Sequence, residues 1–197
     1  MNIDHVATLR NARGELFPSI IDAADIALKS GADSITAHLR EDRRHINDSD
    51  IKDIVTNFPG KLNLEMAATE EMLNIALNIK PFSCCIVPEK REELTTEGGL
   101  DVLSKHNQLK KFIDPLKDAG IRTSFFVDAD EVQLEKSADL DVDCLEIHCG
   151  SYCRAFDRSL NTCEDEFKKI SNIAKLASQL GIEVHAVESL TSYPSIL

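Results

Sequence analysis

The chain has 197 residues, of which 43% are hydrophobic, a length and composition that suit one globular domain with a sizeable core. Its formal net charge of -12 argues against nucleic acid and against anionic membrane surfaces as main partners. We therefore expect a single domain over residues 1–197, in which any bound anion is held by local positive charge.

Strand-like and helical patterns alternate along the chain. Strand-like runs fall at 2–9, 34–39, 62–66, 84–87, 123–127, 144–149 and 183–186. Helical patterns fall at 18–30, 47–57, 69–79, 108–119, 129–138 and 163–180. Gly31, Gly120 and Gly181 follow three of the helical runs, where a left-handed cap favours glycine. This alternation predicts an α/β fold with a parallel sheet.

The strand-like runs alternate between polar and apolar residues, which favours a closed barrel over an open sheet. In the second run, Ile35, Ala37 and Leu39 share one face, and polar residues share the other. An open parallel sheet is covered on both faces and reads as continuously apolar. Polar side chains near strand C-termini are typical of a TIM (β/α)8 barrel. No G-x-G-x-x-G follows the first run, so a dinucleotide-binding fold has no support.

The six cysteines include no C-x-x-C pair, and the sequence shows no signal-peptide pattern and no long apolar span. We therefore expect reduced thiols in a cytoplasmic protein, with neither disulfides nor a zinc site.

Two glutamates close strand-like runs and are candidates for acid–base chemistry. Glu65 ends the run at 62–66, where partial desolvation would raise its pKa towards a useful range. The alternative is an interior carboxylate balanced by an arginine. Glu146 either relays a proton or orients His148.

Histidines and arginines gather after the first two strand-like runs. His5, His38 and His148 lie on or beside strand ends, where they could bind substrate, transfer protons or ligate a metal. A metal-dependent hydrolase usually spaces its histidines by one residue on a strand, and this pattern is missing, so no metal site is predicted. Five arginines can hold phosphate or form a salt-bridge belt, an alternative that applies above all to Arg43 and Arg44. They are Arg10, Arg13, Arg40, Arg43 and Arg44.

The segment 84–99 runs from an apolar strand into a polar loop that ends in two glycines. Its hydroxyls, positive charges and glycine N–H groups suit a phosphate ester. No lysine stands inside the barrel at a strand's C-terminal end, so an enzyme-bound imine is not predicted.

Four blocks carry a resemblance to a known family: NIDHVATLRNARG at 2–14, HLREDRRHI at 38–46, NLEMAATEEML at 63–73 and EKREELTTEGGLDV at 89–102. In this order they resemble the pyridoxine 5'-phosphate synthase family of vitamin B6 biosynthesis. The resemblance implies condensation of 3-amino-2-oxopropyl phosphate with 1-deoxy-D-xylulose 5-phosphate. It also implies a TIM barrel with no cofactor or metal and a homo-oligomer, an octamer in the family.

The resemblance also assigns residues. It implies that Glu65, His38 and Glu146 are catalytic. It implies that the substrates are bound by Asn2, Asp4, His5, Arg13, Arg40, Arg43, His45, Thr95, Thr96, Gly98 and Gly99.

The tail departs from the family. Its members continue after the seventh strand with a glycine-histidine-glycine loop, a helix and an eighth strand carrying N-I-G-H. Here the V-H-A at 184–186 is followed at once by VESLTSYPSIL, so we expect the loop and the eighth strand to be missing. Either the given sequence skips the loop, or the loop is truly deleted. Two alternatives therefore stay open: another phosphosugar lyase or isomerase on the same barrel, and an inactive phosphate-binding barrel.

Overall fold

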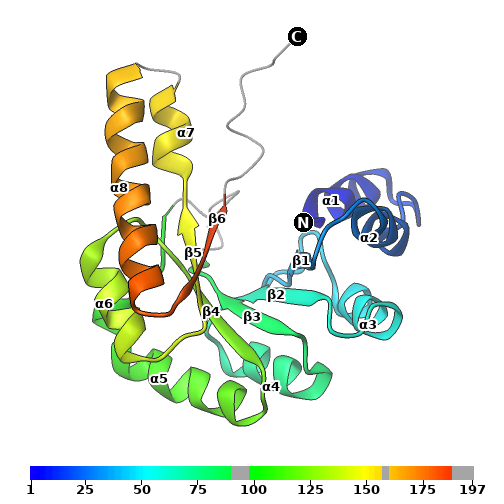
Figure 1. Cartoon of the computed structure of the whole chain (residues 1–197). Helices are drawn as coiled ribbons and strands as arrows, with labels where there is room; N and C mark the ends of the chain where they lie inside the picture. The colour runs from blue at the N-terminus through cyan, green and yellow to red at the C-terminus, as the bar shows by residue number, and fades with distance from the viewer. Residues whose placement is uncertain (90–97, 157–159, 188–197) are drawn as a thin grey trace. The chain divides into compact units, whose positions relative to one another are not determined.

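The computed structural model describes residues 1–89, 98–156 and 160–187, in which helices and parallel strands alternate along the chain (Figure 1). These residues form two compact units. The first comprises Met1–Ile86 and Phe112–Arg122, and the second comprises Val87–Lys111 and the chain from Thr123 onward. Each unit is α/β, which confirms the predicted class. The expectation of a single domain stays a prediction.

The first unit is built on three parallel strands. They are β1 (Ile35–His38), β2 (Leu62–Met66) and β3 (Ser83–Ile86), with β2 paired to both others. Its helices are α1 (Asp4–Arg13), α2 (Ile20–Lys29), α3 (Asp48–Asn57), α4 (Glu70–Ile79) and the end of α5 (Val102–Asp118). All five residues of β2 are buried, as expected for a strand with neighbours on both sides.

The second unit repeats this plan. Its strands are β4 (Arg122–Val127), β5 (Cys144–His148) and β6 (Glu183–Val187), with β5 paired in parallel to both others. Its helices are the first part of α5, then α6 (Glu131–Asp139), α7 (Gly150–Phe156) and α8 (Leu160–Gln179). Among the described residues, no helix is long and apolar enough to cross a membrane.

Short polar side chains set the helix starts. Ser19, Thr69 and Asp130 each accept a hydrogen bond from a backbone N–H in the first turn of α2, α4 and α6. The predicted glycine ends are also confirmed, because Gly31, Gly120 and Gly181 have φ angles of 104°, 74° and 79°. Local sequence therefore fixes where most elements begin and end.

Six of the seven predicted strands are confirmed, and the first is wrong. Only Asn2 pairs with β1, through a single parallel bridge to Thr36, and helix α1 begins at Asp4. The segment that follows is rich in helix formers and ends at Gly14, whose φ of 65° caps the helix. Helix α7 was not predicted either. His5, expected beside a strand end, therefore lies on α1 with an exposed side chain.

A buried ion pair ties α1 to α3 in the first unit. Arg10 donates from Nη1 and Nη2 to the two carboxylate oxygens of Asp50, at 2.5 and 2.9 Å. The second oxygen of Asp50 also accepts the N–H of Asn47, which completes a capping box at the start of α3. The predicted anion-binding cluster therefore loses Arg10, whose guanidinium is occupied by Asp50.

Replacing Asp50 with Asn should lower the free energy of unfolding by about 3 kcal/mol, because it leaves the buried Arg10 charge without its counter-ion. The side chains of Arg10 and Asp50 are only 12% and 8% exposed. Urea unfolding followed by circular dichroism measures the change.

The matched control is Asp25→Asn, which breaks the exposed pair with Lys29, whose side chain is 75% exposed. That change should cost well under about 1 kcal/mol. Equal losses in the two variants would show that the Arg10–Asp50 pair does not stabilise the fold.

Native thiol labelling should modify Cys149 and Cys153 first. These two are half-buried, whereas Cys84, Cys85, Cys144 and Cys163 are buried, and none of the six forms a disulfide. Burial also raises the pKa of the Cys84 thiol, which removes its reactive thiolate form. A chromogenic disulfide reagent should therefore count two fast thiols per native chain and six after denaturation. Fast labelling of Cys84 would contradict this account.

Candidate active site

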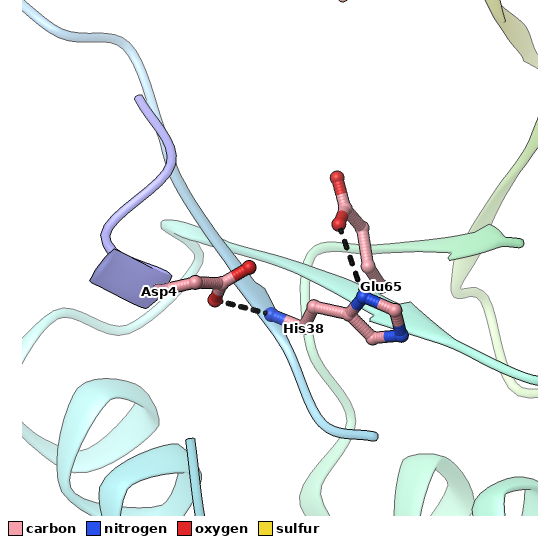
Figure 2. A group of neighbouring side chains, drawn as sticks. All are labelled: Asp4, His38 and Glu65. Carbon is pink, nitrogen blue, oxygen red and sulfur yellow. Dashed lines mark hydrogen bonds and ion pairs between the residues drawn. The ribbon is translucent and has the colours of Figure 1, made fainter. Parts of the chain in front are cut away.

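Asp4, at the beginning of α1, places its carboxylate beside the end of β1. Residues 1–3 run alongside β1, and the N–H of Ile3 donates to the carbonyl oxygen of Thr36 at 3.1 Å. The chain then turns into α1, and Oδ1 of the buried Asp4 accepts the backbone N–H of His38 at 2.8 Å (Figure 2). Asn2 donates from Nδ2 to Oδ2 of Asp4 at 2.9 Å. Asp4 therefore holds the end of β1 in place.

The register of β1 and β2 places His38 directly opposite Glu65. Nδ1 of His38 lies 3.7 Å from Oε2 of Glu65, and the Glu65 carbonyl accepts the N–H of Leu39 at 3.0 Å (Figure 2). Both residues are buried, with exposed fractions of 5% and 8%. A carboxylate and an imidazole at this separation can share or exchange a proton through a small shift or through a substrate group.

The same residues could also hold a metal ion. One ligand atom from each of Asp4, His38 and Glu65 lies within 4.8 Å of the other two. Both oxygens of Asp4 already accept hydrogen bonds, from His38 and Asn2, so an ion would have to share or displace those contacts.

His45 lies beside this pair and is held in one tautomer. Its ring centroid is 6.0 Å from that of His38, and its Nδ1 accepts the N–H of Ile46 at 2.9 Å. An accepting Nδ1 carries no proton, so Nε2 is the donor of the neutral ring. Burial lowers the pKa of His45, and the charges of His38 and Arg40 act in the same direction, against Asp4.

Of the predicted arginines, one is buried beside the candidate site, and two are held in salt bridges with nearby carboxylates. Arg40 is buried, with Nε 3.8 Å from Oδ1 of Asp42. Arg43 instead donates to Asp48 at 2.9 Å and to Glu71 at 2.5 Å.

Arg44 donates to Asp42 at 2.7 Å. These partnerships lower the pKa of Asp48 and Asp42. They support the salt-bridge alternative for Arg43 and Arg44. Arg13 is exposed in the last turn of α1.

The remaining predicted residues belong to the second unit or lie outside the described residues. Glu146 is buried at 3% exposure on β5, opposite Phe126 of β4 and His185 of β6. Gly98 and Gly99 lie next to Asp128 at the end of β4. Thr95 and Thr96 fall in 90–97, outside the described residues.

Sequence reasoning missed two acidic residues that the structure makes important. Asp50 binds Arg10, and Asp128 binds His148. Asp128 carried a signal, since it is the polar residue directly after the apolar strand β4. The only sequence signal at Asp50 is its place in the capping box with Asn47, and a capping box does not predict a contact with a distant residue such as Arg10.

A buried imidazole and carboxylate at the C-terminal ends of adjacent parallel strands form a candidate acid–base site on an α/β scaffold. Residues 1–194 match the model of the family described as pyridoxal phosphate biosynthesis protein PdxJ. The chain belongs to this family.

Relatives with a known name support the same assignment. The chain is 51% identical over 191 residues to pyridoxine 5'-phosphate synthase of Rhodopseudomonas palustris strain BisB18, covering 96% of this chain and 75% of the relative. It is 48% identical to the enzyme of the same name from Bradyrhizobium diazoefficiens, covering 100% of this chain and 82% of the relative.

Among solved structures, a tryptophan synthase alpha-subunit mutant from Pyrococcus furiosus is similar, with a TM-score of 0.51 and 10% identity. The match covers 85% of this chain and 80% of that one. At this identity the likeness shows only a TIM-barrel-like α/β fold.

The free energy of unfolding should fall as the pH drops below about 6.5, in part through His45. Its pKa is lowered in the folded protein, so below the ordinary value of 6.5 the unfolded chain binds the proton more readily. Above that value this histidine contributes no pH dependence. In His45→Asn, urea unfolding from pH 5 to 8 should show a shallower fall, by at most about 1.4 kcal/mol per pH unit. Parallel curves for the two proteins would contradict the assignment.

Proposed function

We propose that this chain is a pyridoxine 5'-phosphate synthase. It condenses 3-amino-2-oxopropyl phosphate with 1-deoxy-D-xylulose 5-phosphate, giving pyridoxine 5'-phosphate, phosphate and water. The observation that carries the proposal is the buried His38–Glu65 pair, with 3.7 Å between Nδ1 and Oε2. Identities of 48–51% to enzymes of this name support the choice of reaction.

The chemistry requires repeated proton transfers. The amine of one substrate forms an imine with the ketone of the other, phosphate and water leave, and an aldol-type closure makes the pyridine ring. Glu65 is suited to remove and return protons, because it is buried and has an imidazole beside it. His38 assists at the carbonyl or at the departing phosphate, and Asp4 holds its backbone.

Other roles follow the family resemblance. Glu146, buried on β5, is the second catalytic carboxylate. Arg40 and His45 lie near His38 and suit contacts to substrate oxygens, and Asn2 orients Asp4. The remaining proposed substrate contacts are His5, Arg13, Thr95, Thr96, Gly98 and Gly99. Arg43 is the weakest of the proposed contacts, because acidic side chains occupy its guanidinium.

Three finer features belong to the same proposal. They are a TIM (β/α)8 barrel, a homo-oligomeric assembly and a place in the cytoplasm. The alternation of strands and helices and the TIM-barrel-like neighbours support the first. Family membership supports the other two.

The purified chain should release phosphate and form fluorescent pyridoxine 5'-phosphate only when both substrates are present. Glu65→Gln should lower kcat by about 10²–10⁴, because the amide retains the shape of the side chain but cannot accept a proton. Stopped assays of phosphate and of product fluorescence measure both effects.

The matched control is Glu135→Gln on α6, the same substitution at an exposed position, which should leave kcat unchanged. Unimpaired turnover in Glu65→Gln would remove Glu65 from the mechanism. Phosphate release from one substrate alone would indicate a phosphosugar lyase instead.

A further inference from the structure

A second imidazole–carboxylate pair lies in the second unit, and the reaction roles above do not use it. His148 ends β5, and its Nδ1 lies 3.0 Å from Oδ1 of Asp128, directly after β4. The ring of Phe126 packs against the imidazole at a centroid distance of 5.2 Å. The side chain of His148 is only 8% exposed, whereas that of Asp128 is 57% exposed.

This pair fixes the orientation of the imidazole. The hydrogen bond with His148 lowers the pKa of Asp128, and the N–H of Gly99 adds to the effect, so Asp128 is an ionised acceptor. An ionised carboxylate can only accept, hence Nδ1 of His148 carries a proton. Its Nε2 points away from Asp128 and has no hydrogen-bond partner among the described residues.

Gly150 lies directly beside Nε2, at a position where a side chain would not fit. A Cβ at this position would lie 2.5 Å from Nε2 of His148 and 3.0 Å from Nη1 of Arg154. Since both nitrogens lie so close to one point, they are at most 5.5 Å apart, the sum of the two distances. Arg154 also donates from Nη2 to Oγ of Ser151 at 3.3 Å, a contact that does not use Nη1.

A guanidinium donor and an imidazole nitrogen at this separation match one phosphate oxygen. Charge-assisted N–H···O bonds are about 2.8 Å long, so an oxygen placed between Nε2 and Nη1 can bond to both. The Arg154 guanidinium supplies the positive charge, and a hydrogen phosphate oxygen can accept from Nη1 and donate its own proton to Nε2. In a chain of net charge -12, such local charge is what an anion requires.

We propose that His148 and Arg154 form a phosphate-binding site and that Asp128 is the positioning residue that fixes His148. The occupant is the phosphoryl group of a substrate ester or the inorganic phosphate that the reaction releases. This choice of occupant rests on the proposed function, whereas the site itself rests on the geometry of the second unit.

The test is histidine NMR on the full chain carrying ¹⁵N-labelled histidine, titrated first with inorganic phosphate and then with each substrate ester alone. The His148 signals, assigned by their loss in His148→Gln, should shift in a saturable way. Arg154→Gln should weaken this binding at least tenfold, and Arg154→Lys should restore part of it.

Two further variants separate positioning from folding. Asp128→Asn should change the tautomer signature of His148 in the absence of phosphate and weaken binding. Gly150→Ala should block binding although His148, Arg154 and Asp128 are all retained. Lys168→Gln and Asp165→Asn, which alter an exposed ion pair on α8, are the matched controls and should bind normally.

The outcomes distinguish this site from the proposed reaction. If phosphate shifts the His148 signals in a saturable way but the chain forms no product, the phosphate site is supported and the proposed reaction is refuted. Normal product formation without such shifts, or shifts unchanged in Arg154→Gln, would overturn the site alone. Saturation by inorganic phosphate but by neither ester would assign the site to the released product.

Discussion

The register between β1 and β2 is the constraint on which the candidate active site depends. Parallel pairing aligns His38 with Glu65, and a slip of one residue would turn one of the two side chains to the opposite face. Burial of all five residues of β2 fixes that register, because any slip would expose apolar side chains. The strand core and the acid–base pair are therefore specified by the same interaction.

Asp4, a residue outside the sheet, contributes to the candidate site through its carboxylate. Its carboxylate accepts the N–H of His38, the last residue of β1, and Asn2 holds the carboxylate in turn. A buried N–H without a partner would be costly, so this contact stabilises the end of β1 and orients its histidine. Helix α1, tied to α3 through Arg10 and Asp50, keeps Asp4 in position.

The distribution of charge explains how an acidic chain can serve anionic substrates. Most surface arginines near the first site are neutralised locally, since Arg43 and Arg44 bind carboxylates of their own segment and of α4. Arg40 is buried next to the histidines. In the second unit, Arg154 and His148 lie beside Gly150. Positive charge is thus concentrated at a few places.

The sequence alone determined the alternating elements, most helix ends and the family, because these follow from local periodicity, capping residues and contiguous motifs. It also marked Glu65 and His38, since polar residues at strand ends stand out against apolar runs. It misassigned the segment from Asn2 to Leu9, whose β-branched residues suit a strand although the segment also suits a helix. Only tertiary structure decided that outcome, and only it paired Arg10 with Asp50 and Asp128 with His148. Contacts across 20 to 40 residues depend on how the strands and helices pack, which no local pattern encodes.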